Sequence, residues 1–178
     1  AELEELILAL AAPYQQELTI LQTAPGISSP FTAIGIISEI GTNMKAFPSA
    51  KHLCSWAGLT PTNNESAGKK KSVRVSKAGC YIKPLLVQCA NAVVKSTKHP
   101  EMRNRYLRLK KRRGHKKAII AIARMLLTAL YHMLKNGENY NAELYQKSDL
   151  LPVDREITVE QALMIARNQG YKIKSATA

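Results

Sequence analysis

The sequence predicts an all-α protein, a multi-helix domain with a helix-hairpin-helix-like element and a coiled-coil-like helix at its N-terminus. Three observations predict this class. Apolar residues recur at helical spacing, glycine or proline separates the helical segments, and residues 118–134 are apolar on nearly every side, as in a central helix. Hydrophobic residues make up 46% of the 178 residues, which is enough for a sizeable core.

Residues 1–20 are expected to form the end of a coiled-coil connection. Pro13 removes one backbone hydrogen bond and should kink this helix or start a second one. The stripe fits either a core-packing helix pair or a coiled coil between subunits, and the sequence leaves both open. Its apolar positions advance by alternating three and four residues: Leu3, Ile7, Leu10, Tyr14, Leu18 and Leu21.

The segment 21–41 predicts two helices joined by a Pro-Gly turn. Gly26 can adopt a positive φ, and the free amides near Ser28 and Ser29 would attract a phosphate oxygen. A helix-hairpin-helix element usually has Gly-x-Gly-Lys at this step. Here two serines and Pro30 replace it, so a plain helical hairpin competes with a DNA-contacting one. The second helix should turn four residues inward: Ala33, Ile36, Ile37 and Ile40.

The middle of the chain predicts further helices. Ser49 is a suitable N-cap for a short helix that ends at Gly58 and places Trp56 in the core. Residues 81–96 form the next helix, and Gly114 then separates a basic helix from the long apolar one.

We expect the long apolar helix to cover residues 116–134 at the centre of the domain. The polar segment 60–78 should be largely irregular, although the alternating SVRVS could form one short strand. The main domain is assigned to residues 21–140, followed by a polar linker at 141–157. Residues 158–178 should form a C-terminal helix and tail, in which Thr158 and Gln161 make a capping box.

Positive charge is concentrated in one block. The formal net charge is +13 and the isoelectric point is about 9.8. Between Lys69 and Lys117 lie 17 Lys or Arg residues and a single acid, Glu101. This balance usually indicates nucleic acid or an anionic membrane. A membrane-surface helix at 103–113 would have only a thin apolar face, so nucleic acid is the favoured partner.

Several other classes of site are disfavoured. No apolar run should be long enough to span a bilayer. Cys54, Cys80 and Cys89 lack CxxC spacing and a neighbouring His cluster, which indicates reduced, mostly buried thiols in a cytosolic protein. The 11 Glu and 2 Asp residues supply no acidic set in or before the basic block, so we expect no metal site and no cofactor in this chain.

A hydroxyl nucleophile remains as the candidate chemistry. Ser66 stands beside small residues that allow a close backbone approach, and just before a run of three lysines that could hold a phosphate. The same pattern is common in solvated loops without function, and the local sequence alone favours that interpretation.

Three pieces of the chain, in order, resemble the C-terminal transposase domain of a bacterial insertion-sequence family. The family is IS one-ten (IS110), with its IS one-eleven-eleven relatives. The matching pieces are APGISSPFTAIGIISEIGTNMKAFPSAKHLCSWAGLTP, ESAGKKKSVRVSKAGCYIKPLLVQCANA and RGHKKAIIAIARMLLTALYHML. They contain the family's Pro-Gly-Ile turn, Gly-Leu-x-Pro, a Ser before a small-Gly pair, a basic run and Ser-Lys-x-Gly. The match covers 21–140.

This resemblance implies a longer transposase. Its N-terminal RuvC-like domain would hold Mg²⁺ on an Asp-Glu-Asp-Asp set, and a structured guide RNA would direct recombination. A serine in the present domain would attack a DNA phosphate; it aligns with Ser66, and Ser72 and Ser76 are the fallbacks. The implied partners are DNA, the guide RNA and further copies of the protein, without a membrane, in the bacterial cytoplasm near the nucleoid. Because this chain lacks the acidic set, the chain by itself should bind nucleic acid but should not cut it.

The residues predicted to bind nucleic acid combine the hairpin turn with the basic block. They are Gly26, Ser28, Ser29, Lys69, Lys70, Lys71, Arg74, Lys77, Arg105, Arg108, Lys111, Arg112 and Lys116. The competing hypothesis is a non-catalytic helix-hairpin-helix module, which would use the same contacts but would not need Ser66.

Overall fold

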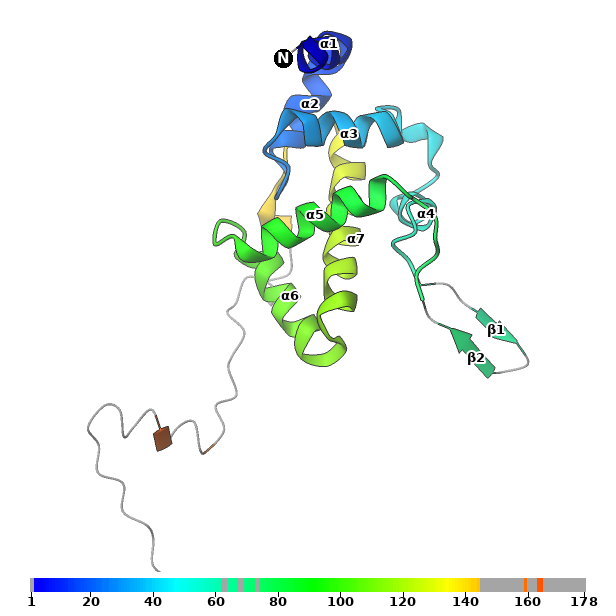
Figure 1. The fold of residues 1–178 in the computed structure, drawn as a ribbon, viewed down its shortest axis with the longest axis vertical. Coiled ribbons are helices and arrows are strands. Elements are labelled where there is room, and N and C mark those ends of the chain that lie inside the picture. The colour runs from blue at the N-terminus through cyan, green and yellow to red at the C-terminus, as the bar shows by residue number, and fades with distance from the viewer. Residues whose placement is uncertain are drawn as a thin grey trace, which may run out of the picture.

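The computed structural model describes residues 2–61, 64–66, 69–72 and 74–144, together with positions 159, 163 and 164. This part of the chain is mostly helical, which confirms the all-α class (Figure 1). The helices are α1 (Glu2–Ala11), α2 (Gln15–Gln22), α3 (Pro30–Ile40), α4 (Ala50–Trp56), α5 (Ile82–Lys95), α6 (Pro100–Arg113) and α7 (His115–Asn136). Short 3-10 turns lie at Ala12–Tyr14, Met44–Ala46 and Ala142–Leu144.

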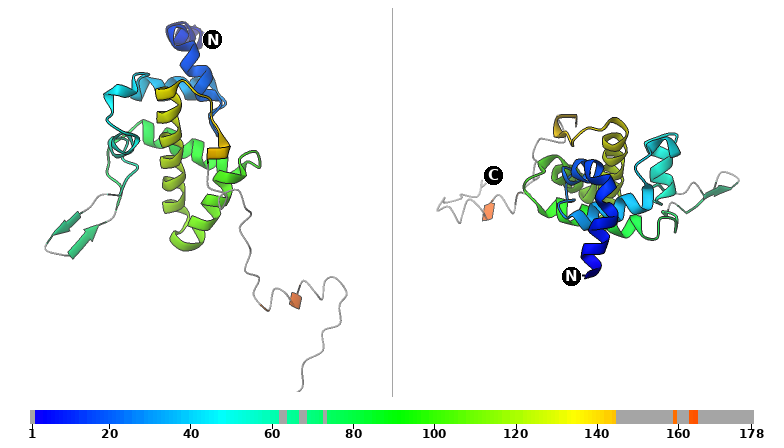
Figure 2. Two further views of the ribbon diagram at one scale, coloured as in Figure 1. Left: turned by 180° about the vertical axis from the view of Figure 1, so that it is seen from behind. Right: turned by 90° about the horizontal axis from the view of Figure 1, so that it is seen from above.

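Helix α7 runs through the centre of the domain, as predicted (Figures 1 and 2). It packs against α2, α4, α5 and α6. Its buried side chains are Ala118, Ile119, Ile122, Ala123, Leu126, Leu127, Leu130, Tyr131 and Met133. By length and composition α7 could cross a membrane, so the prediction that no segment is long enough was wrong. Half of its most apolar window is buried inside the fold, as expected of a core helix.

The N-terminal apolar stripe is divided at Pro13, which begins a 3-10 turn between α1 and α2. After this break, Leu18 and Leu21 are buried in the core. Before it, Leu3 and Leu10 remain about 70% exposed, because α1 extends away from the rest of the domain (Figure 1). Ile7 is half-buried and Tyr14 is 44% exposed, so Leu18 and Leu21 are the stripe residues that lie in the core. A coiled coil between subunits stays a prediction.

Helices α2 and α3 form the expected helical pair around the Pro-Gly turn. Gly26 has a φ of 77°, and the four predicted inward residues of α3 are buried. A Cβ atom at Gly26 would lie 2.7 Å from the carbonyl oxygen of Cys89 and 3.0 Å from Val93 Cγ2. Glycine is thus required here for packing against α5, whatever the turn binds.

Helix α4 begins as predicted, with Ser49 as its N-cap. The Ser49 hydroxyl accepts a hydrogen bond from the backbone amide of His52, at 3.4 Å. The prediction that Trp56 lies in the core was wrong: its side chain is 44% exposed and packs its ring against Phe47, with the ring centroids 5.7 Å apart. Leu53 and Cys54 form the buried side of this short helix, which leaves Trp56 at the edge.

The segment between α4 and α5 is an antiparallel hairpin of β1 (Asn64–Ser66) and β2 (Lys69–Ser72). Two short strands thus interrupt the segment that was expected to be largely irregular, and they lie mostly before SVRVS rather than within it. Ser66 pairs with Lys69, so only Ala67 and Gly68 connect the strands, and two-residue connections containing glycine favour hairpins. An isolated bridge between Pro61 and Val75 continues the pairing toward the body.

The remaining sequence predictions concern the chain after α4. Helix α5 matches the expected 81–96, and Gly114, with a φ of 78°, separates α6 from α7 as predicted. Of the linker at 141–157, only residues 141–144 are described. The C-terminal helix predicted for 158–178 falls outside the described residues apart from three helical positions.

Candidate nucleic-acid interface

The lead serine lies in a protruding hairpin. We call residues 61–75 the arm; it extends from the body beside α4, away from α1 (Figure 1). In the backbone register Ser66 is opposite Lys69, and Glu65 is opposite Lys70. The structure thus brings the serine and the lysine run together on two paired strands.

The two fallback serines lie further from the end of the arm. Ser72 pairs with Asn64, at the inner end of the hairpin. Ser76 lies beyond the Pro61–Val75 bridge and is half-buried, and its hydroxyl accepts a hydrogen bond from the backbone amide of Ala78, at 3.3 Å. The Ser76 hydroxyl therefore helps to shape a local turn.

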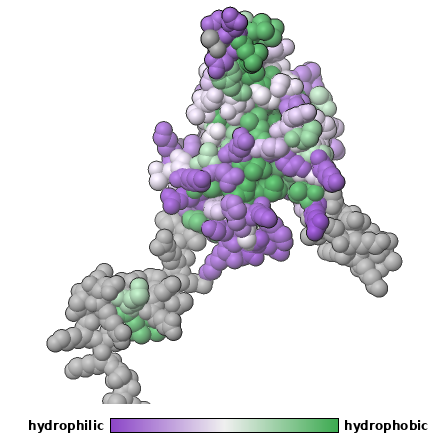
Figure 3. All heavy atoms as spheres, viewed as in Figure 1, coloured by the Kyte–Doolittle hydropathy of each residue, from purple (hydrophilic) through white to green (hydrophobic). Residues whose placement is uncertain are grey.

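A second cationic surface lies where α6 meets α7. We call residues 110–117 the basic corner; its Lys and Arg side chains are all exposed: Lys110, Lys111, Arg112, Arg113, Lys116 and Lys117. Figure 3 shows hydrophilic side chains gathered at this end of the molecule. Cations in the last turn of α6 suit its helix dipole, but Lys116 and Lys117 lie in the first turn of α7, where anions are favoured. A bound phosphate would relieve this repulsion.

The other predicted basic residues divide into two groups. Arg74 and Lys77, at the body end of the arm, are exposed. Arg105 and Arg108 are half-buried on α6 and already interact within the fold. Because they are half-buried, they are less accessible to a ligand than the exposed Lys111, Arg112 and Lys116.

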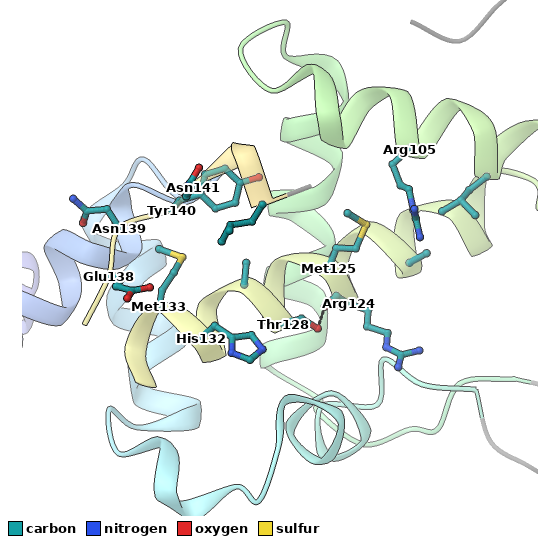
Figure 4. Close-up of a pocket in the computed structure, with 14 residues that line it drawn as sticks. Arg105, Arg124, Met125, Thr128, His132, Met133, Glu138, Asn139, Tyr140 and Asn141 are labelled. Carbon is teal, nitrogen blue, oxygen red and sulfur yellow. Dashed lines mark hydrogen bonds between the residues drawn. The ribbon is translucent and has the colours of Figure 1, made fainter. Parts of the chain in front are cut away.

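Sequence reasoning missed Arg124 on α7, which sits inside a segment that looks purely apolar. Together with Arg105 it lines a groove of about 580 Å³ between α6, α7 and residues 138–144 (Figure 4). The floor of the groove is largely apolar, with Met125 and Ala129 among its residues. Only the packing of three separate elements reveals this groove.

The hairpin turn at Gly26 lies apart from the arm. Gly26 approaches Cys89 and Val93 in the second half of α5, whereas the arm joins the body near Lys83, at the start of that helix. Six or more residues of α5, at about 1.5 Å per residue, separate the two contacts. Ser28 and Ser29 are exposed, with Ser29 as the N-cap of α3. The structure therefore does not merge the predicted turn site with the arm.

The described residues do not fit a Mg²⁺ site. No three His, Cys, Asp or Glu side chains within the described ranges converge on one point. Glu101, the acid of the basic block, is only 1% exposed. It accepts a hydrogen bond from the Tyr140 hydroxyl at 3.0 Å, and His99 Nδ1 lies 3.3 Å from its carboxylate. This carboxylate serves the packing of the segment after α7.

Comparison with known proteins places the chain in a family. A model described as the Transposase IS116/IS110/IS902 family matches residues 18–107, which include the arm but end before the basic corner. The chain is 28% identical over 127 residues to the insertion element IS110 uncharacterized 43.6 kDa protein of Streptomyces coelicolor, covering 70% of this chain and 30% of that protein.

Two further relatives are named pilin gene-inverting proteins, from Moraxella bovis and Moraxella lacunata. Each is 28% identical over 132 residues, covering 72% of this chain and 40% of the relative. The chain thus spans less than half the length of these curated relatives. No solved structure matches. Because the family model covers half of the chain, from α2 into α6, the chain belongs to the IS116/IS110/IS902 family of transposases.

Proposed function

We propose that this chain is the DNA-binding catalytic domain of an insertion-sequence transposase, and that Ser66 is the nucleophile for DNA strand exchange. One observation carries the proposal. The strand ending at Ser66 pairs with the lysine-rich strand in the arm, and the basic corner lies at the same end of the molecule (Figures 1 and 2). A DNA duplex lying across this end would meet both cationic surfaces.

The proposed step exchanges one phosphate ester for another. The Ser66 hydroxyl oxygen bonds to a DNA phosphorus, and the bond from that phosphorus to a 3′ oxygen breaks. The serine proton passes to an acceptor, and the leaving oxygen takes up a proton to become a free 3′ hydroxyl. The phosphoserine link preserves the ester for rejoining. The resemblance assigns the acceptor and the Mg²⁺ site to a RuvC-like domain outside this chain.

The lysines of β2 would stabilise the reacting phosphate. Negative charge increases on its oxygens as the serine attacks, and cations fixed nearby lower the energy of that state. Lys69 is opposite Ser66 in the register, and Lys70 and Lys71 follow on the same strand. Neither fallback serine has a lysine as its register partner: Ser72 pairs with Asn64, and Ser76 lies outside the hairpin.

The wider partners follow from the resemblance, and the names of two relatives support DNA among them. A protein named for inverting a pilin gene acts on DNA, which favours strand exchange as the reaction of this chain's family. We propose a structured guide RNA and further copies of the protein as additional partners. We further propose residues 21–140 as the functional domain, with 1–20 as the end of the coiled-coil connection and 141–157 as a linker. The isolated chain is proposed to bind nucleic acid without cutting it.

Binding is tested first with this chain alone. We expect affinity for duplex DNA to fall steeply with salt, because each neutralised phosphate contributes about 0.9 to the log-log slope. Replacing Lys111, Arg112 and Lys116 with Glu should lower that slope by about 2 to 3. The control reverses Lys45 and Lys51, which are exposed outside the basic block. Equal effects per reversed charge in the two variants would show that the basic corner is not the binding surface.

Catalysis is tested in a full-length protein that carries this segment. We expect Ser66→Ala to abolish strand exchange while DNA affinity stays unchanged, with Ser72→Ala and Ser76→Ala as matched hydroxyl controls. If Ser66→Ala retains strand exchange, the catalytic proposal fails and the non-catalytic module remains. Loss of activity with Ser72→Ala or Ser76→Ala instead would move the nucleophile to that serine.

A further inference from the structure

The arm is held at its base by two chain segments that cross at a pair of glycines. Gly58 has a φ of 66° and Gly79 a φ of 65°. A Cβ atom at Gly58 would collide with the carbonyl oxygen of Ala78, and one at Gly79 with the carbonyl oxygen of Ala57. The backbone of the segment that enters the arm is therefore in direct contact with the backbone of the segment that leaves it. We call residues 57–59 and 76–79 the foot of the arm.

Each half of the foot is also fixed to a helix. The backbone amides of Gly58 and Leu59 donate to the carbonyls of Ser55 and Cys54, at 3.0 and 2.9 Å, which is the Schellman ending of α4. Leu59 itself is buried. On the other side, the carbonyl of Gly79 accepts the backbone amide of Lys83 in the first turn of α5, at 3.0 Å.

The Lys83 side chain ties the outgoing segment to α5. Its ammonium donates to the backbone carbonyl of Ser76 at 2.5 Å, and it lies beside Gly58 in the incoming segment. Lys83 is half-buried, whereas Lys77 in the foot is exposed. Lys83 is partly buried, and its ammonium already donates to a backbone carbonyl. It is therefore better suited to holding the backbone in place than to binding phosphate.

The foot matters because the arm amplifies any movement at its base. Ser66 lies at the far end of β1, beyond the Pro61–Val75 bridge. A small rotation at residues 76–79 would displace the end of the hairpin by a larger distance. Misplacing a reacting group by about 1 Å can reduce a rate by about 100-fold.

We infer that Lys83 is a positioning residue for strand exchange: by holding the Ser76 carbonyl at the glycine crossing, it fixes the direction in which the arm presents Ser66. This inference rests on the proposed function. It assigns Lys83 a role through the path of the chain rather than through a contact with phosphate. It also accounts for a lysine in the first turn of α5, where the helix dipole disfavours a cation.

The test compares Lys83→Met with Lys95→Met in the full-length protein. Both variants remove one positive charge from α5, but Lys95 is exposed in the last turn and lies away from the foot. We expect Lys83→Met to lower the strand-exchange kcat by about 10- to 100-fold, with a Kd for DNA within about 2-fold of that of Lys95→Met. Lys83→Arg keeps the donor and should restore most of the rate.

A second readout follows the arm directly in this chain. A fluorophore attached to Ala67→Cys, in a Cys80→Ser background, reports the motion of the hairpin by its anisotropy. We expect Lys83→Met to lower that anisotropy and Lys95→Met to leave it unchanged. The melting temperature is measured in parallel, so that a global loss of stability is recognised.

The outcomes separate this inference from the function on which it rests. If Ser66→Ala is inactive but Lys83→Met matches Lys95→Met in kcat and anisotropy, the positioning role is refuted and the nucleophile stands. If Ser66→Ala keeps its activity, the proposed function fails; the anisotropy then decides alone whether Lys83 orders the arm. A loss of rate in Lys83→Met explained wholly by weaker DNA binding would also overturn the positioning role.

Discussion

The close packing of the turn at Gly26 against α5 can be tested by the change in the free energy of unfolding when Gly26 is replaced. A Gly26→Ala substitution adds one methyl group at a φ of 77°, a conformation that costs an L-residue about 1 to 2 kcal/mol. The new Cβ would lie 2.7 Å from a backbone oxygen of Cys89, which cannot move without shifting α5. Overpacking of this kind typically costs a further 1 to 3 kcal/mol, so we expect a total loss of about 2 to 5 kcal/mol.

The matched control is Gly137→Ala. Gly137 has a φ of 69°, and a Cβ there would meet nothing within 4 Å, so it carries the backbone strain without the collision. Urea unfolding of both variants, followed by circular dichroism, should show Gly26→Ala to be less stable by about 1 to 3 kcal/mol. Equal losses in the two variants would refute the close contact between the turn and α5.

Three further predictions concern buried polar groups. In the native chain the exposed Cys80 should react with a maleimide well before Cys89, because burial raises the pKa of the Cys89 thiol to about 11 and keeps it protonated. Since that pKa lies above its usual 9.0, the free energy of unfolding should fall as pH rises from 9 to 11, and Cys89→Ala should flatten this fall. Tyr140→Phe removes the hydroxyl donor to the buried Glu101 and should cost about 1 to 3 kcal/mol in urea unfolding, whereas Tyr81→Phe, at an exposed position, should cost nearly nothing.

Helical periodicity predicted the core because burial follows it directly. The inward residues of α3 and the span of α7 agree with their apolar spacing to within a few residues. Trp56 shows the limit of this reasoning. Residue type suggests burial, but the position of Trp56 on α4, beside Leu53 and Cys54, places its ring at the edge against Phe47. One short helix offers too few positions to bury every large side chain.

The candidate site was only partly predictable, because some of its contacts are local in sequence and others depend on tertiary packing. The lysine run and Ser66 are adjacent in sequence, so their proximity needed no tertiary information. The hairpin was missed because its strand sequences, NES and KKKS, carry no apolar alternation. Gly58 crosses Gly79, and Lys83 contacts Ser76, only because α4 and α5 both pack on α7 and so bring these segments together. The local sequence does not indicate this approach.

The proposed nucleophile can be identified by trapping its DNA adduct. A full-length protein carrying this segment is incubated with DNA, denatured and digested with trypsin, which cleaves after Lys and Arg. The three candidate serines then fall on separate peptides: Ser66 on 52–69, Ser72 on 72–74 and Ser76 on 75–77. Fragmentation by mass spectrometry locates the modified residue and distinguishes Ser66 from Ser55 on the first peptide. The account predicts a phosphodiester-linked nucleotide on Ser66; an adduct on another residue, or none during active strand exchange, would contradict it.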